Sequence, residues 1–276
     1  NDFSFLEISE HFATLSSLIY LSLVIMSQFT LIDGSGLLFR SYYGLPELSD
    51  DYGANTHMIY GMAKMTLWLL MEKPEYFAIA RDVWGKTHRH ELDESYKANR
   101  VKAPDDLIRQ IQLSHQMIED MGLPAFGYPG YEADDVIHSF AQKANTIEGL
   151  YTTIVSSDKD LKQLINPTTL IRDPMKNKTS DYLSFEKKHG FGPELLLDYL
   201  ALIGDSADNI SWVVGIGPKT AYTLITSYQT IENIYDHIDT ISWSTKQKLL
   251  KGREDAFQSK ELVKLALVPE MHDLSL

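Results

Sequence analysis

The chain has 276 residues, of which 44% are hydrophobic and 23% charged, as in a globular protein that buries a core. It contains no cysteine, which excludes a disulfide scaffold, a thiolate zinc site and a thiol nucleophile. The formal net charge of −13 argues by itself against a nucleic-acid partner, because DNA binding usually rests on a basic surface. Acids that cluster around bound cations weaken that argument, so the positions of the charges matter more than their sum.

The first 25 residues differ from the rest of the chain. The apolar run Leu15–Ile25 is too short to span a bilayer, and no Lys or Arg precedes Arg40, so a secretory signal is not supported. We therefore predict that residues 1–25 are an extension ahead of a natural start at Met26, and that the protein has no membrane partner.

Three short apolar runs predict buried strands, and an aspartate follows each one: Asp33, Asp82 and Asp158. The runs are Phe29–Ile32, Tyr76–Ala80 and Tyr151–Val155. Helical patterns between them cover Met58–Met71, Asp105–Met121 after a first-turn Pro104, and a segment with Glu132, Asp134 and Asp135 in its first turn. This alternation predicts an α/β fold with a mostly parallel sheet covered on both faces. The three aspartates should then share the edge where such sheets carry their sites.

The pattern becomes helical from about residue 186. Candidate helices are Pro193–Leu202, Lys219–Ser227, Ile231–His237 and Ser244–Leu250. We predict three regions: the extension 1–25, a catalytic core at 26–185, and a helical module at 186–276.

Nine carboxylates form the main candidate site. They are Asp33, Asp82, Glu132, Asp134, Asp135, Asp158, Asp160, Asp205 and Asp208. Taken singly, each is most simply a helix cap or a solvated turn residue. As a group they would repel one another unless hard cations such as Mg²⁺ or Mn²⁺ neutralised them. Two such ions can clamp a phosphodiester during hydrolysis, and no serine triad, nucleophile elbow or Walker loop competes with this interpretation.

Five segments resemble the 5′-nuclease family, which includes the 5′→3′ exonuclease domain of bacterial DNA polymerase I and the flap endonucleases. They occur in family order at residues 31–35 (LIDGS), 131–136 (YEADDV), 157–161 (SDKDL), 204–209 (GDSADN) and 215–221 (GIGPKTA). The resemblance covers about residues 28 to 270, and the five segments together are highly specific. It implies that all nine acids bind two or more metal ions, some of them through water. It assigns Asp33, Asp82, Glu132, Asp134 and Asp135 to the first metal group and the rest to the second.

The resemblance also implies a helical arch at about 84–120, through which single-stranded 5′ DNA passes. Residues 81–102 carry six basic groups against four acids, a local footprint for a phosphate chain. Lys97 and Arg100 are implied as catalytic contacts to the scissile phosphate. The implied DNA contacts of this region are Arg40, Lys86, Arg89 and Tyr96, the last by stacking on a base. Without the acids nearby, a solvated and salt-bridged helix face would be the preferred explanation for these residues.

Gly215, Gly217 and Lys219 resemble the hairpin of a helix-hairpin-helix element. Glycines let the backbone approach a phosphate, and the following helix N-terminus offers free N–H groups. The resemblance implies binding of duplex backbone without sequence reading, with a K⁺ ion at the hairpin. Ser211-Trp212 departs from the usual Pro-Gly and puts that ion site in doubt.

Three functions remain open at this point. The first is a structure-specific 5′ nuclease with exonuclease and flap endonuclease action, acting on 5′ flaps, nicked or gapped duplex and 5′ single-stranded ends. It would be a cytoplasmic, nucleoid-associated monomer, with a polymerase and a ligase as partners in replication and repair. No polymerase domain follows, so we interpret the chain as a stand-alone nuclease or a fragment. The alternatives are a PIN-type metal-dependent ribonuclease and a non-catalytic branched-DNA binder.

Overall fold

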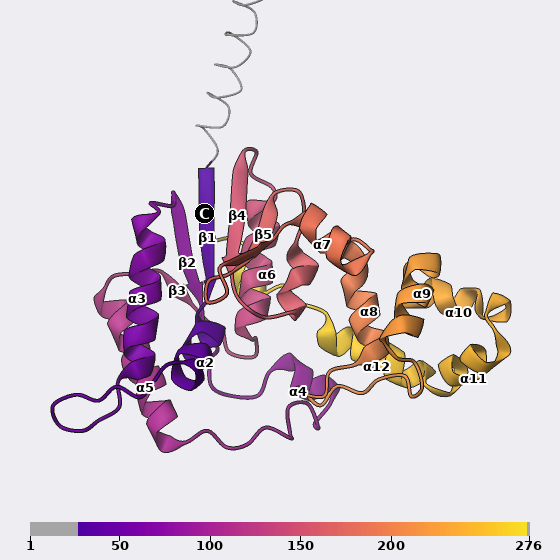
Figure 1. Ribbon diagram of the computed structural model, residues 1–276, viewed down its shortest axis with the longest axis horizontal. Helices are drawn as coiled ribbons and strands as arrows, with labels where there is room; N and C mark the ends of the chain where they lie inside the picture. The colour runs from indigo at the N-terminus through magenta and orange to yellow at the C-terminus, as the bar shows by residue number, and fades with distance from the viewer. Residues whose placement is uncertain (1–26, 275–276) are drawn as a thin grey trace, which may run out of the picture.

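The computed structural model describes residues 27–274, and a six-stranded sheet organises the larger part of them (Figure 1). The strand order is β3-β2-β1-β4-β5-β6, in which the first five strands are parallel and β6 runs antiparallel to β5. The strands are β1 (Ser27–Asp33), β2 (Tyr76–Ala80), β3 (Ala125–Phe126), β4 (Leu150–Val155), β5 (Thr169–Asp173) and β6 (Lys178–Ser180). β1 lies at the centre, where Phe29 pairs with Tyr76 on one side and Thr152 on the other.

Helices cover both faces of the sheet, because successive residues of β1 point to opposite sides. Leu31 packs with α6 (Ala133–Ala144) in one core, and Ile32 packs in a second core on the other face. The second core is formed with α2 (Gly34–Gly44), α3 (His57–Met71) and α5 (Asp105–Asp120). This confirms the predicted mostly parallel sheet with two covered faces.

The predicted strands agree with the observed ones to within two residues, but β3, β5 and β6 were not predicted. β3 has two residues and β6 has three, so neither is long enough to show a periodic pattern. Pro104 was expected in the first turn of a helix, and this was wrong. Its extended backbone, with ψ near 149°, makes it the N-cap of α5 instead.

The C-terminal residues form a helical lobe beside the sheet (Figure 1). Its helices are α7 (Tyr182–His189), α8 (Leu196–Ile203), α9 (Pro218–Tyr228), α10 (Ile231–Asp236), α11 (Trp243–Lys251) and α12 (Arg253–Val263). The predicted helix Pro193–Leu202 is divided into a 3₁₀ turn at Pro193–Leu195 and α8. The lobe has an apolar core of its own, and α12 packs back against α8.

The segment predicted as a helical arch is helical only at its two ends. α4 (His88–Leu92) begins it and α5 ends it, and residues 93–104 between them contain no helix. This segment runs past the carboxyl ends of the strands in Figure 1. The predicted extension 1–25 lies outside the described residues. None of the helices in the described part of the chain has the length and apolar character needed to cross a membrane.

Candidate active site

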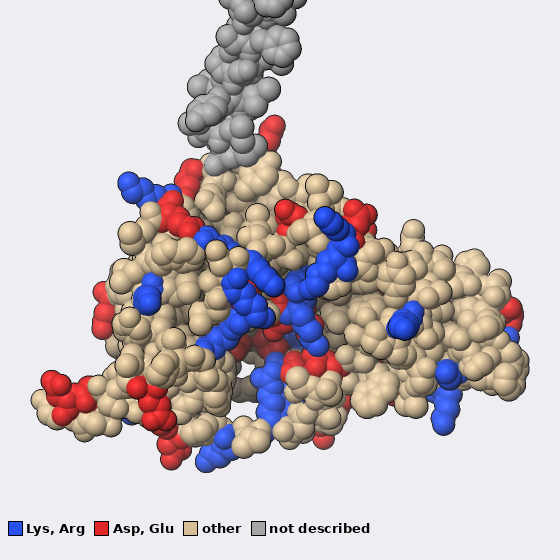
Figure 2. All heavy atoms as spheres, viewed as in Figure 1, with Lys and Arg blue, Asp and Glu red and all other residues tan. Residues whose placement is uncertain are grey.

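The carboxyl ends of β2, β1 and β4 open onto a cavity of about 340 Å³ that brings seven predicted site residues together. They are Asp33, Asp82, Glu132, Asp134, Asp158, Lys97 and Arg100. Figure 2 shows a central hollow in which Asp and Glu side chains lie between surrounding Lys and Arg side chains. The net charge of −13 is therefore unevenly distributed, and at this cavity basic side chains surround the acidic ones.

Asp33 ends β1 and also caps α2. Its carboxylate accepts hydrogen bonds from the Gly36 N–H at 2.7 Å and from the Ser156 hydroxyl at 2.7 Å. A Cβ at position 36 would overlap this carboxylate, so any other residue there would force the Asp33 side chain to move. Burial is the main cause that raises the pKa of Asp33 to about 6, and the charges of Asp158 and Asp82 add to it.

Asp82 and Asp134 line the same cavity as Asp33. The Ala133 N–H donates to Asp82 Oδ1 at 2.8 Å, which joins the end of β2 to the start of α6. In the described part of the chain, no hydrogen bond reaches the carboxylate of Asp134. Burial and the nearby charges of Asp158, Asp33 and Asp82 raise the pKa of Asp134 well above its usual value.

The second predicted group follows β4 and continues into the lobe. Asp158 Oδ1 accepts from the Asp160 N–H at 2.8 Å, and burial together with the Asp158 charge raises the pKa of Asp160 to about 7. Asp160 Oδ1 is buried without a hydrogen-bond partner. Asp205 pairs with Lys159 at 2.9 Å, and Asp208 pairs with Arg100 at 2.6 Å.

Carboxylate oxygens are suitable ligands for a hard cation, but in this structure these side chains are not arranged as a complete set of metal ligands. Within residues 27–274, no three His, Asp or Glu side chains stand at metal-binding spacing. Several of these carboxylates instead accept hydrogen bonds from other groups of the protein, as Asp33 does from the Ser156 hydroxyl. Asp160 Oδ1 is a buried carboxylate oxygen without a donor, and the pKa of Asp134 is raised by burial and by its acidic neighbours; both states favour a bound cation or a proton.

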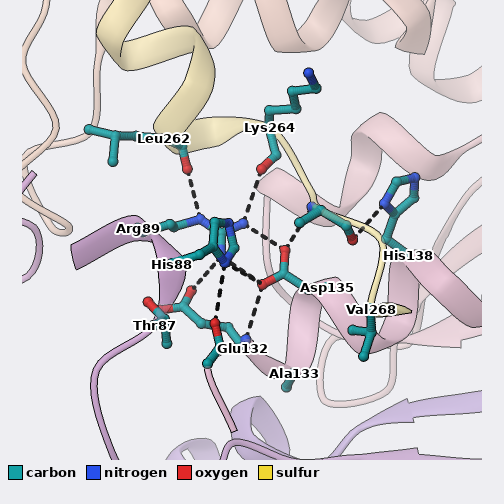
Figure 3. Close-up of polar contacts among 12 residues, drawn as sticks. Thr87, His88, Arg89, Glu132, Ala133, Asp135, His138, Leu262, Lys264 and Val268 are labelled. Atoms are coloured by element: carbon teal, nitrogen blue, oxygen red, sulfur yellow. Dashed lines mark hydrogen bonds and ion pairs between the residues drawn. The ribbon is translucent and has the colours of Figure 1, made fainter. Parts of the chain in front are cut away.

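Asp135 and Arg89 depart from their predicted roles (Figure 3). Their side chains form two bonds of 2.8 Å, and the Ala266 and Glu132 N–H groups donate to the same carboxylate at 2.9 and 3.0 Å. Asp135 is 0% exposed and Arg89 is 2% exposed. The predictions that Asp135 binds a metal ion and that Arg89 contacts DNA are therefore wrong in this structure, because neither group can be reached.

The Arg89–Asp135 pair joins three distant segments. Arg89 extends from α4 and also donates to the carbonyl oxygens of Leu262 at 2.8 Å and Lys264 at 3.1 Å, while Asp135 lies on α6 (Figure 3). The pair therefore fixes the start of the predicted arch to the first turn of α6, where Glu132 and Asp134 lie.

Tyr96 is 3% exposed, so the prediction that it stacks on a base is also wrong in this structure. Its hydroxyl donates to Glu132 Oε2 at 3.2 Å, and Lys97 Nζ lies 2.8 Å from Glu132 Oε1. Lys97 has a φ of 56°, which L-residues rarely adopt, and its N–H donates to the Asp208 carbonyl at 2.9 Å. The turn thus places the Lys97 ammonium among the acids.

The remaining predicted DNA contacts lie away from the cavity floor. Lys86 and Lys219 are exposed, and Arg40 forms an ion pair with Asp173 at 2.8 Å. Gly215 has a φ of 85°, and α9 begins two residues after Ile216, as a hairpin before a helix requires.

The predicted K⁺ ion at this hairpin has no support in the donor set. The Gly215 carbonyl already accepts from Lys248 Nζ at 3.2 Å. That ammonium occupies an oxygen that a K⁺ ion would need, so the K⁺ remains a prediction.

Comparison with known proteins identifies the relatives of this fold. Residues 28–190 match the family model of the 5′-3′ exonuclease N-terminal resolvase-like domain, and residues 191–273 match that of the 5′-3′ exonuclease C-terminal SAM fold. The chain belongs to the 5′-3′ exonuclease family. This confirms the resemblance and the predicted class of enzyme.

Individual members of the 5′-3′ exonuclease family show how much of each relative the chain covers. It is 37% identical over 243 residues to a 5′-3′ exonuclease of Aquifex aeolicus, covering 87% of this chain and 82% of that one. It is 38% identical over 240 residues to the DNA polymerase I of Caldicellulosiruptor bescii, covering 84% of this chain but only 28% of the polymerase.

A solved structure supports the same fold. The bacteriophage T5 flap endonuclease, determined as a pseudo-enzyme-product complex with DNA and metal ions, superposes with a TM-score of 0.70 at 20% identity. The match covers 86% of this chain and 89% of that one.

Within this 5′-3′ exonuclease fold, sequence reasoning missed two serines that hold the acids. The Ser156 hydroxyl donates to Asp33 and accepts from the Asp158 N–H at 2.9 Å, so it spans the two strand-end aspartates. The Ser35 hydroxyl accepts from the Asp82 N–H at 2.9 Å. Their only signal in the sequence was their position within two residues of a strand-end aspartate.

Proposed function

We propose that this chain is a structure-specific 5′ nuclease that hydrolyses DNA phosphodiesters with two divalent metal ions, as a 5′→3′ exonuclease and 5′-flap endonuclease. The observation that carries the proposal is the single cavity shared by five strand-end and helix-start acids and the cations Lys97 and Arg100. A phosphodiester needs both kinds of group, because its charge increases during hydrolysis.

The acids on the cavity side are the proposed metal ligands. Asp33, Asp82, Glu132, Asp134 and Asp158 would hold Mg²⁺ or Mn²⁺ at the cavity, and Asp160, Asp205 and Asp208 would contribute to a second ion. Such ions, when bound, activate the attacking water and stabilise the leaving oxygen. The buried, unpartnered Oδ1 of Asp160 and the raised pKa of Asp134 among its acidic neighbours support this proposal most directly.

Lys97 and Arg100 are the proposed contacts to the scissile phosphate. Each now pairs with a carboxylate, Lys97 with Glu132 at 2.8 Å and Arg100 with Asp208 at 2.6 Å. Transfer of Glu132 and Asp208 to metal ions would release both cations toward a phosphate in the same cavity. Both cations would then pair with the phosphate and stabilise the charge that develops on it in the transition state.

The helical lobe is the proposed duplex-binding module. Gly215, Gly217 and Lys219 lie at the exposed turn before α9, where backbone and ammonium groups suit phosphates. We divide the chain functionally into a catalytic core at 26–185 and this module at 186–276. A cytoplasmic, monomeric enzyme of replication and repair that hands DNA to a polymerase and a ligase is part of the same proposal.

Substitution Asp134→Asn tests the proposal. Cleavage of an end-labelled 5′ flap in Mg²⁺ should be lost, while binding of the same flap remains measurable by fluorescence anisotropy. Asp236→Asn is the matched control, because Asp236 is an exposed residue at the end of α10. Normal cleavage by Asp134→Asn would refute the metal assignment.

The same assay separates the two alternatives by product. A PIN-type ribonuclease would cleave single-stranded RNA at least as well as flapped DNA. A non-catalytic binder would retain the flap without forming product in Mg²⁺ or Mn²⁺. Products from nicked and single-stranded DNA run beside the flap would locate the cleavage position.

A further inference from the structure

A second polar cavity, of about 570 Å³, lies beyond Asp158 at the end of the acidic row. Ser156 and Ser157 line it, so it begins where the acid-bearing end of β4 stops. Its other walls come from the 3₁₀ turn after β4, the β5–β6 hairpin and α7. We call it the basic pocket, after the four lysines that line it: Lys162, Lys176, Lys178 and Lys188.

The positive charge of the basic pocket is not balanced by acids. The acid that lines it is Asp173, which is already paired with Arg40 at 2.8 Å and with Lys176 at 3.7 Å. Among the ion pairs of residues 27–274, none involves Lys162, Lys178 or Lys188.

The polar lining of the basic pocket suits a phosphate group. Besides the lysines, it offers side-chain donors from Ser156, Ser157, Asn177, Thr179, Ser180 and Ser184. A phosphate presents several acceptor oxygens and one or two negative charges, and it is held by such combinations of ammonium and hydroxyl donors.

A solvated lysine surface is the simpler explanation for any one of these side chains. Lys188, for example, lies in the last turn of α7, where a cation is favourable without any ligand. That explanation does not account for four lysines from separate segments lining one cavity. The β5–β6 hairpin is also held in place, because Asp173 accepts from the N–H groups of Met175 and Lys176 and from Arg40.

We propose that the basic pocket binds one phosphate of the nucleic-acid substrate, next to the phosphate that is cleaved. This rests on the proposed nuclease function for the presence of nucleic acid, and it adds a subsite outside the acid cavity. The phosphate can be an internal diester of the backbone or a terminal 5′ monoester, because both present the same oxygens to the lysines.

The salt dependence of binding tests the proposal without any cleavage. A fluorescent 5′ flap is titrated with protein in Ca²⁺ at several KCl concentrations, and the logarithm of the association constant is plotted against that of the salt. For Lys162→Ala/Lys188→Ala the slope should decrease by about 1, because one phosphate contact releases about one counterion. Lys188→Glu should weaken binding more than Lys188→Ala does.

Lys187→Ala is the matched control, because Lys187 precedes Lys188 on α7 but does not line the pocket. An unchanged slope in Lys162→Ala/Lys188→Ala, or a decrease equal to that of Lys187→Ala, would overturn the proposal. Because the readout is binding, a chain that binds with a reduced slope but never cleaves would remove the nuclease proposal and leave this one in place.

Modified DNA distinguishes the two sources of phosphate. If the ligand is a terminal monoester, the effect of Lys162→Ala/Lys188→Ala should disappear when the flap carries a 5′ hydroxyl. If it is an internal diester, the effect should persist there and disappear when one backbone phosphate is replaced by a neutral methylphosphonate. An effect that no single modification removes would contradict binding of one phosphate.

Discussion

Adjacent residues Asp134 and Asp135 should respond in opposite ways to the same substitution in metal-free protein. Asp135 accepts four hydrogen bonds of 2.8 to 3.0 Å, two of them from Arg89, and is 0% exposed. Among the described residues no side chain or N–H group donates to the Asp134 carboxylate, and burial with nearby acids raises its pKa. We therefore expect Asp135→Asn to destabilise the fold and Asp134→Asn to stabilise it.

The magnitude follows from the environment of each charge. Asp135→Asn leaves Arg89 charged at 2% exposure without a counterion, and breaking a buried pair in this way costs about 3–5 kcal/mol. Asp134→Asn removes a charge that the folded state disfavours, so the free energy of unfolding should increase above neutral pH. The exposed pair Arg81–Glu119, at 3.1 Å, provides a matched control, because Glu119→Gln should cost at most about 1 kcal/mol.

Urea unfolding in EDTA at pH 8, followed by far-ultraviolet circular dichroism, measures these differences. A double variant, Arg89→Met/Asp135→Leu, adds a second test. It should be less destabilised than the sum of its single substitutions, because no unpaired buried charge remains.

An Asp135→Asn variant within about 1 kcal/mol of the parent would show that the buried pair does not hold α4 to α6 as the structure indicates. A double variant equal to the sum of its single substitutions would refute the coupling between the two side chains. Destabilisation by Asp134→Asn equal to that of Asp135→Asn would refute the difference in environment.

Three further predictions follow from the site. Burial raises the pKa of Asp33 to about 6 and of Asp160 to about 7, above the usual value of 3.8, so the folded state binds more protons than the unfolded one. Thermal melts in EDTA should therefore show a melting temperature that falls as pH rises from about 4 through about 7. Addition of Mg²⁺ at pH 8 should restore the melting temperature. A melting temperature that does not change with pH would contradict this prediction. Lys97→Ala should lower single-turnover cleavage by about 10²- to 10³-fold, while flap affinity changes much less; equal losses in both would indicate a binding role alone. Lys219→Ala should reduce the salt slope of duplex binding by about 1, equally for unrelated sequences, and sequence-dependent losses would argue against a phosphate contact.

The sequence predicted the scaffold and the acid row because both depend on local patterns. Buried parallel strands appear as continuous apolar runs, so the runs alone are enough to place Asp33, Asp82 and Asp158 at one edge of a sheet. The structure confirms these strands and places the three aspartates on one cavity.

The partners of buried polar groups could not be predicted in this way. Arg89 and Asp135 are 46 residues apart, and the carbonyl groups that complete their network lie more than 170 residues from Arg89. Both looked like functional residues, because a charged residue in a motif has the same sequence signature whether it faces a ligand or a buried partner.

By itself, the sequence determined the family, the positions along the chain of the strands that carry acids, and the residue types that suit metal ions and phosphate. The tertiary structure alone decided which charged groups remain available. It buried Tyr96 and Asp135, left Asp160 Oδ1 without a donor, and brought together the four lysines of the basic pocket. The physical reason is that periodicity reports which face of an element is buried, whereas the pairing and exposure of a polar side chain depend on segments distant in the chain.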